Sequence, residues 1–339
     1  MHTNIQKRST GFGAALILLA LLLRLVGAVP GYAQKSEPAL RWIVRQPVAG
    51  LSAPCGTDPV ATTPVFSTTL PTQPTTETPI LPIRPALTIT QAEAALVSLR
   101  VASDCGYEPD WRSLLLQPLD WDLTAAEPTV LIYHSHACEC YTKETGQDYT
   151  ELVNCRTKTL QYNMVAVGDL LAALLAQAGI GVIHDVQLHD DPSYNDAYNN
   201  SRASVEQYLA QYPSIRLVLD LHRDAATNPD GSRYRTAATV DGQPAAQIMF
   251  VVGTDHTGSF HPDWQENLAL ALKMQMVLEQ IAPGITRPIV LRGSRFNQDV
   301  STGTLLVEVG ASGNTLQEAL RTVRILAQAI VALQYGTDA

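Results

Sequence analysis

The sequence is short of positive charge. Its 23 Lys and Arg residues stand against 32 Asp and Glu, and three of the 23, Lys7, Arg8 and Arg24, lie within the first 33 residues, which contain no acid. The remainder has 20 basic and 32 acidic residues and a formal charge of −12. Binding to nucleic acid requires clustered Lys and Arg side chains against the phosphates, so we expect no nucleic-acid partner.

Cysteine is also scarce. The five cysteines are Cys55, Cys105, Cys138, Cys140 and Cys155. This odd number leaves at least one thiol unpaired or paired with another chain, and the usage is compatible with export. Cys138 and Cys140 are too close in sequence to pair easily with each other, so Cys155 is the candidate partner of one of them. The alternative is that these thiols ligate a metal ion.

Charge is absent from Gly11 to Leu23, directly after Lys7 and Arg8. This pattern predicts an export signal rather than part of the fold. Two outcomes are open. The segment is cleaved after Ala33, or it is kept as a membrane anchor, because the long side chain of Arg24 can reach the interface and lengthen the span to roughly 20 residues.

Composition divides the chain into four parts. Residues 1–33 are the signal or anchor, and residues 34–89 are a disordered stalk, since Pro and Thr fill 17 of the 32 positions from Pro54 to Pro85. Residues 90–127 are an N-terminal extension. Residues 128–339 are the main domain, which has the apolar content to bury a core.

Strand-length apolar runs alternate with helical periodicity after residue 128. Strands are predicted at 129–133, 181–185, 215–221, 247–253, 288–291 and 304–309. Helices are predicted from Met164 to a cap at Gly179, over 201–212, after Pro262 through Met276, and from a capping box at Thr315 through Ile330. This alternation predicts an α/β fold, with a mostly parallel twisted sheet and helices on both faces.

Four side chains suited to a hydrolytic zinc site lie at or just past the ends of predicted strands. His136 and Glu139 follow the first strand with His-x-x-Glu spacing, His222 ends a second, and Glu308 lies in the last. Because ligands collect beyond the carboxyl ends of parallel strands, these groups are expected to converge. Two imidazoles and one carboxylate bind zinc and leave its fourth position to water. Glu308 would then act as general base.

Alternatives exist for each residue of this set. His134 is the rival of His136 as a ligand, although a residue within the strand is better placed to pack or to hydrogen-bond to a ligand. Either His136 or His222 alone is more simply a loop or core histidine. Glu308 is alternatively a buried carboxylate that caps the amides of residues 310–313.

Polar residues near these positions are candidates for substrate contacts. Asp220 would orient an imidazole, and Arg223 would bind a substrate carboxylate or form a salt bridge. Arg292, Arg295 and Asn297 lie in a loop expected to border the same cleft, where arginines suit carboxylate capture, unless they are simply solvated loop residues.

Several longer stretches resemble one known family. They are residues Val130 to His136 followed by Glu139, His189 to Asn195, Asp220 to Asp224, Met249 to Thr254, His261 to Asn267, Arg295 to Gln298, and Leu306 to Gly310 running into Gly313 to Thr315. Together they resemble the stage II sporulation protein P family of cell-wall hydrolases over most of residues 129–335. The sequence departs from the family pattern at Cys138 and Cys140, where small polar residues are expected, and at Asp299.

The resemblance implies an exported, zinc-dependent N-acetylmuramoyl-L-alanine amidase with a zinc amidase/carboxypeptidase-like fold. Such an enzyme cuts peptidoglycan between the lactyl group of muramic acid and the first stem-peptide residue, and members are also linked to stem-peptide endopeptidase activity. The resemblance implies zinc ligands at His136, Glu139 and His222 and a catalytic Glu308. It further implies a membrane anchor with the catalytic domain on the extracytoplasmic side, and cooperation with a lytic transglycosylase in engulfment during sporulation.

Two other functions stay open from the residues. One is a zinc carboxypeptidase or endopeptidase that acts on peptides, because the same metal set serves both reactions. The other is an inactive module that binds the wall or recruits a partner. The three ligand types together with Glu308 argue against the inactive module.

Overall fold

The computed structural model describes residues 99–119 and 122–336. In chain order the elements are β1 (Val101–Ser103), α3 (Trp111–Leu116), β2 (Val130–Tyr133), a 3-10 turn (Leu160–Tyr162), α4 (Met164–Gln177), β3 (Val182–His184), a 3-10 turn (Tyr194–Asp196), α5 (Ala197–Gln211), β4 (Leu217–Asp224), β5 (Ala237–Val240), β6 (Gln243–Ala246), β7 (Ile248–Gly253), α6 (Trp264–Ile281), β8 (Ile289–Arg292), a 3-10 turn (Gln298–Val300), β9 (Thr304–Ala311) and α7 (Leu316–Gly336). The predicted leader and stalk lie outside the described residues. Among the helices that are described, none combines the length and the apolar stretch needed to cross a membrane.

Seven strands form one mixed sheet in the order β1-β8-β7-β9-β4-β2-β3. Strands β3, β2, β4 and β9 are parallel to one another. Strand β7 pairs antiparallel with β9, whereas β8 and β1 run parallel to β7. The sheet thus consists of two parallel groups that run in opposite directions. The carboxyl ends of β7 and β8 therefore point in the opposite direction to those of β2, β4 and β9.

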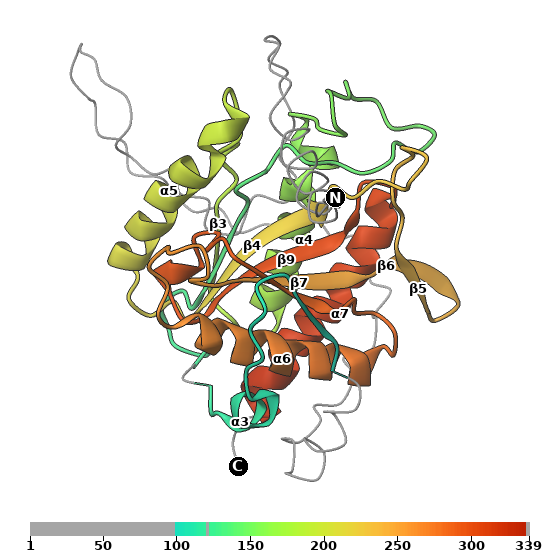
Figure 1. Cartoon of the computed structure of the whole chain (residues 1–339). Coiled ribbons are helices and arrows are strands. Elements are labelled where there is room, and N and C mark those ends of the chain that lie inside the picture. Colours follow the sequence, from blue (N-terminus) through green and yellow to red (C-terminus); the bar gives the residue numbers. More distant parts are fainter. Residues whose placement is uncertain (1–98, 120–121, 337–339) are drawn as a thin grey trace, which may run out of the picture.

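Helices cover both faces of the sheet, as predicted (Figure 1). Alternate residues of β2 show the two sides: Val130 and Ile132 join a large core with residues of α4, α6 and α7, while Leu131 and Tyr133 join a smaller core beneath α5. In Figure 1, α5 lies at one end of the molecule and the β5–β6 hairpin projects at the other. The face beneath α5 is the one that carries the candidate site.

Local signals set the ends of the main helices. The Asn163 side chain caps α4 by accepting a hydrogen bond from the Val165 amide at 3.0 Å, and Gly179 follows the helix with φ 82°, a left-handed conformation that glycine adopts without steric cost. The predicted capping box opens α7: the Glu318 amide donates to Thr315 Oγ1 at 3.3 Å, and the Thr315 amide donates to Glu318 Oε2 at 3.2 Å. A side-chain cap of this kind stabilises a helix by about 1 kcal/mol.

Strand β4 continues to Asp224, three residues past the predicted end at Leu221. The extension exists because β9 lies alongside and continues the ladder, with His222 directly opposite Glu308. The register shifts between His222 and Asp224, where the regular pairing ends. His222 is therefore held inside a central strand rather than on a loop after it.

Residues 99–119 complete the edge of the same sheet. Strand β1 pairs parallel with β8, and Tyr107 stacks on Trp264 of α6 with ring centroids 5.0 Å apart. The Tyr107 hydroxyl donates to Asp255 at 2.8 Å. The described part of the predicted N-terminal extension is thus packed against the main domain.

Candidate functional site

The four predicted metal and catalytic residues lie toward the carboxyl ends of the parallel strands β2, β4 and β9. His222 and Glu308 are register partners on β4 and β9, and residues paired in this way project from the same face. His136 and Glu139 lie on the turn that follows β2, in which the Glu139 amide donates to the His136 carbonyl at 3.1 Å. All four are buried, with at most 6% of each residue exposed.

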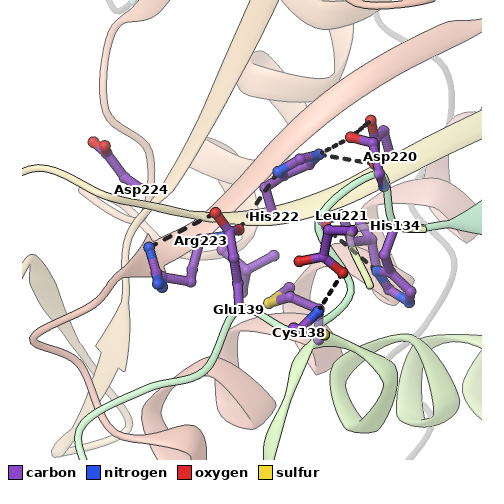
Figure 2. Close-up of polar contacts among 12 residues, drawn as sticks. His134, Cys138, Glu139, Asp220, Leu221, His222, Arg223 and Asp224 are labelled. Atoms are coloured by element: carbon purple, nitrogen blue, oxygen red, sulfur yellow. Dashed lines mark hydrogen bonds and ion pairs between the residues drawn. The ribbon is translucent and has the colours of Figure 1, made fainter. Parts of the chain in front are cut away.

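His222 lies between two carboxylates (Figure 2). Its Nε2 is 2.9 Å from Asp220 Oδ1, and its Nδ1 is 3.5 Å from Glu139 Oε2. Ser135 fixes Asp220 by donating from its amide at 2.8 Å and from its hydroxyl at 2.7 Å. Burial alone would lower the pKa of His222, but Asp220 and Glu139 outweigh it and raise that pKa well above the usual value. With Nε2–H donated to Asp220, Nδ1 is the nitrogen turned toward Glu139.

Glu139 is a buried, charged carboxylate. Burial favours its neutral form, but Arg223 and then His222 lower its pKa well below the ordinary value. The Arg223 amide donates to Glu139 Oε2 at 3.2 Å, and Arg223 Nη1 lies 3.7 Å from Oε1. Its negative charge is thus maintained beside the imidazole of His222.

Arg223 is bound to the loop that follows β2. Its Nε donates to the Cys140 carbonyl at 2.9 Å, and its Nη2 donates to the carbonyls of Asn154 at 2.8 Å and Cys155 at 2.7 Å. Only 2% of the residue is exposed. Of the two roles predicted for Arg223, the structure shows the internal ion pair, together with bonds that tie down both ends of the loop behind Glu139.

His136 is held against two tyrosines that sequence reasoning did not single out. Its ring stacks on Tyr194 with centroids 4.3 Å apart, and it meets Tyr198 edge-on at 5.4 Å. The guanidinium of Arg156 lies 5.0 Å from the Tyr194 ring centre and pairs with Asp190 at 2.7 Å. Tyr194 belongs to the stretch from His189 to Asn195 that carries the family resemblance, and this was the available signal.

Glu308 is not needed as a cap for the turn that follows it. The amides of the turn bond elsewhere. Gly310 donates to the Gln247 carbonyl, Ala311 to the Asn314 side chain, Ser312 to the Asp224 carbonyl and Gly313 to the Tyr234 carbonyl. These four amides therefore have other acceptors, and Glu308 projects from the same face of the sheet as His222.

His134, the rival of His136, points to the opposite face. Its Nδ1 donates to the Leu221 carbonyl at 3.0 Å, and its Nε2 lies 2.9 Å from His184 Nε2. Burial, and next the neighbouring His184, lower the pKa of His134 to about 3. A Cβ at Gly168 of α4 would lie 2.3 Å from His184 Nε2 and 2.7 Å from His134 Nε2, so glycine lets the helix close over this pair. His134 therefore binds β4 at Leu221, the residue before His222, from the α4 face of the sheet.

The loop after β8 is divided between two locations. Arg292 lies at the carboxyl end of β8 and pairs with Asp104, at the edge of the sheet away from Glu308. The sequence predicts Arg292 beside the same cleft as Glu308, and this prediction is wrong. Because β8 runs opposite to β9, Arg292 lies away from the carboxyl end of β9. Arg295 Nη1 pairs with Asp299 at 3.1 Å.

Asn297 holds Tyr198, one of the two tyrosines that contact His136. Its backbone is left-handed, with φ 58°, and its Nδ2 donates to the Tyr198 carbonyl at 2.8 Å. Phe296, the residue before it, has its ring 5.9 Å from that of Tyr198. Asn297 thus fixes the start of α5 against His136.

The donor set fits zinc in its chemistry. Two ligands of one tetrahedral zinc ion lie about 3.3 Å apart, since each is about 2.0 Å from the ion. In the structure Glu139 Oε2 and His222 Nδ1 are 3.5 Å apart. The rings of His136 and His222 have centroids 5.4 Å apart. Across residues 99–119 and 122–336, no three or more His, Cys, Asp or Glu side chains are grouped closely enough to hold a metal ion as they lie. Binding would thus require the side chains of this set to move closer together.

Comparison with known families identifies the lineage of this fold. The profile of Stage II sporulation protein P matches residues 84–331, more than half of the chain. The chain belongs to the stage II sporulation protein P family. The resemblance inferred from the sequence is confirmed.

One curated member of the family is Stage II sporulation protein P of Bacillus subtilis (strain 168). It is 27% identical over 230 residues, which cover 63% of this chain and 53% of that protein. The matched region thus spans about half the length of this relative.

Solved amidase structures show a weaker likeness. The CwlD amidase from Clostridioides difficile, solved in complex with the GerS lipoprotein, is 14% identical with a TM-score of 0.35, covering 62% of this chain and 95% of that one. The N-acetylmuramoyl-L-alanine amidase AmiC2 of Nostoc punctiforme is 13% identical with a TM-score of 0.34, covering 61% and 94%. Scores this low support no residue-by-residue comparison.

Proposed function

We propose that this chain is a zinc-dependent peptidoglycan hydrolase, an N-acetylmuramoyl-L-alanine amidase, with a second activity on stem-peptide crosslinks. The observation that carries the proposal is the arrangement of His222, whose Nε2 is held by Asp220 at 2.9 Å while Nδ1 faces Glu139 at 3.5 Å. A carboxylate that fixes the outer nitrogen of a histidine is the usual support for a metal ligand. Membership of the sporulation family supports the cell wall as the substrate.

His136, Glu139 and His222 are the residues that would hold the ion. Zinc bound there would supply positive charge to polarise the amide carbonyl and to acidify a water molecule. Asp220 and Ser135 keep His222 in one tautomer, and Arg223 keeps Glu139 charged and in place. These contacts orient His222 and Glu139 before the substrate arrives.

Glu308 is the proposed general base. It would take a proton from the attacking water as the new C–O bond forms at the amide carbon. As the C–N bond breaks, the same carboxyl group would pass that proton to the leaving nitrogen of the stem peptide. The products are a lactyl carboxylate on the glycan and a stem peptide with a free N-terminus.

Location and partners complete the proposal. The leader would anchor the protein in the membrane, or release it if cleaved, with residues 128–339 on the extracytoplasmic side. We propose a lytic transglycosylase as a partner, because an enzyme that frees the glycan from its peptides and one that cuts the glycan act on the same polymer. The acidic chain carries little charge attraction for an anionic wall, so close contacts or a partner would supply the affinity.

The test is product analysis. The full chain, purified in a mild detergent, is incubated with intact peptidoglycan, with added zinc and after chelation, and the released fragments are identified by mass spectrometry. Chelator-sensitive release of whole stem peptides with free N-terminal alanine is expected. Cut peptides that stay attached to glycan would instead establish an endopeptidase or carboxypeptidase, and no release with or without zinc would leave a binding module.

Two variants assign the roles. Glu308→Gln should keep bound zinc and lose turnover by about 10²-fold or more, the typical contribution of proton transfer. Glu206→Gln changes an exposed carboxylate of α5 that pairs with Arg202, and it should retain full activity. Undiminished lysis by Glu308→Gln would remove the catalytic assignment.

A further inference from the structure

The loop that follows Glu139 begins at Cys140 and ends at Cys155, and the two cysteines are neighbours in space. The Sγ atoms of Cys140 and Cys155 are 3.6 Å apart, and the Cys140 amide donates to the Cys155 carbonyl at 2.9 Å. Both residues are thiols in the structure and both are buried. The main chain therefore already holds the two sulfur atoms in contact across a loop of the intervening residues.

The other described cysteines are directed elsewhere. The Cys138 amide donates to Asp190 Oδ1 at 3.2 Å. Cys105 lies in a separate part of the core, where Thr254 Oγ1 is 3.6 Å from its sulfur. Cys55 lies outside the described residues. The sequence left open which neighbour of Glu139 would pair with Cys155, and these contacts favour Cys140.

We propose that Cys140 and Cys155 are a site of disulfide formation that staples the loop behind Glu139. The oxidant is a disulfide compound, either a small molecule or an oxidoreductase with a disulfide in its active site. One cysteine thiolate attacks that disulfide, which forms a mixed disulfide and releases one reduced thiol. The second thiolate then attacks the mixed disulfide, so that the Sγ–Sγ bond forms and a second thiol leaves. Two protons and two electrons pass from the protein to the oxidant.

The staple acts at the point where Arg223 is bound. The guanidinium of Arg223 donates hydrogen bonds to the carbonyls of Cys140 and Cys155 themselves, at 2.9 and 2.7 Å. A covalent bond between the two cysteines would keep these carbonyls together when the loop fluctuates. It would thereby hold Arg223 and its contacts with Glu139.

The loop also offers a route for exchange. Val153, two residues before Cys155, is 63% exposed, and the backbone at Asn154 and Cys155 is left-handed, with φ 62° and 55°. Residues with few buried contacts open locally more readily than the strands of the sheet. Oxidation would thus occur either before the loop packs or during such openings.

Peptide mapping tests the pairing. The full chain is equilibrated with oxidised or reduced glutathione, its free thiols are blocked, and it is digested with trypsin without reduction. Cys140 and Cys155 fall in different peptides, 113–143 and 144–156, because cleavage occurs after Arg112, Lys143 and Arg156. The oxidised chain should yield these two peptides linked, with a mass about 2 Da below their sum.

Matched serine variants show which sulfur is used, since peptide 113–143 also contains Cys138. The link should persist in Cys138→Ser and disappear in Cys140→Ser and Cys155→Ser. Separate, blocked peptides from the oxidised wild type would overturn the proposal, and so would a link that survives in Cys140→Ser. Neither result depends on whether the chain hydrolyses peptidoglycan.

Thermal unfolding tests the staple itself. The oxidised wild type should unfold about 5 °C or more above the reduced form, because the bond restricts the unfolded chain. Cys140→Ser should show no difference between the two conditions. Equal Tm values for oxidised and reduced wild type, with the link demonstrated by mapping, would overturn the stapling role.

Discussion

His134 and His136 are two residues apart, yet they lie in opposite environments. His136 faces α5, with His222 and its two carboxylates beside it. His134 faces α4 and is bonded to a carbonyl and to His184. In a continuous strand alternate residues share a face, so both imidazoles would have pointed the same way. The strand ends at Tyr133, and the turn that follows carries His136 to the other side.

The two environments give histidine opposite properties. On the α5 face the pKa of His222 is raised well above the usual value, because the carboxylates of Asp220 and Glu139 outweigh burial. On the α4 face burial, with His184, lowers the pKa of His134 to about 3. The ring nitrogens of His222 thus face two carboxylates, whereas those of His134 contact a backbone carbonyl and a second imidazole. Residue type alone therefore does not decide which histidine lies beside carboxylates.

The largest expected difference concerns metal affinity. Asp220→Asn removes the charge that fixes His222 Nε2, and it should lower zinc affinity by about 10- to 100-fold, the usual effect of losing such a support. His184→Asn alters the partner of His134 on the other face and should leave zinc affinity unchanged. Zinc titration with a competing chelator measures both. Equal losses in the two variants would remove the distinction between the faces.

A smaller effect is expected from pH. His134 is neutral when folded and has an ordinary pKa near 6.5 when unfolded, so the unfolded state binds the extra proton as pH falls below that value. Its contribution to stability is therefore complete above pH 6.5 and is lost progressively toward about pH 3. Between pH 7 and pH 5 this costs about 2 kcal/mol.

Urea unfolding of the metal-free chain at the two pH values measures this loss. His134→Gln should reduce the difference between them by that amount. The exposed His256→Gln should keep the wild-type difference. An unchanged pH dependence in His134→Gln would contradict the environment assigned to His134.

The smallest effect is expected at Gly168. Alanine in place of glycine inside a helix ordinarily stabilises it by about 1 kcal/mol. Here the new Cβ would lie 2.3 Å from His184 Nε2, and overpacking of this kind should turn the gain into a net loss of about 1 kcal/mol. The same substitution in a His184→Ala background should recover the ordinary gain. Stabilisation by Gly168→Ala in the wild type would show that α4 does not close over the pair.

Much of this architecture follows from local sequence. The central strands, the cap at Gly179 and the capping box at Thr315 and Glu318 were predicted from periodicity and turn chemistry, and the structure confirms them. The rule that ligands gather at the carboxyl ends of parallel strands also placed His222 beside Glu308. The length of β4 was underestimated, because its last residues are strand only through their pairing with β9.

The remaining features depend on contacts between distant segments. The direction of β8 could not be predicted, because a short apolar run looks the same in a parallel and an antiparallel strand. Since β8 runs opposite to β9, Arg292 lies far from the carboxyl end of β9. The contacts of Tyr194 and Tyr198 with His136 depend on the packing of this segment against the sheet, which local sequence does not specify. The sequence predicts Arg223 as either a substrate contact or an ion pair, and the structure shows it paired with Glu139 and buried among the carbonyls of the loop.

The sequence by itself determined the elements, the family and the residue types at the site, because periodicity, caps and motifs act over a few neighbouring residues. Only the tertiary structure decided which face each histidine occupies, which carboxylate supports His222 and which cysteine faces Cys155. These outcomes depend on strand direction and on burial, which arise from pairing between segments far apart in the chain.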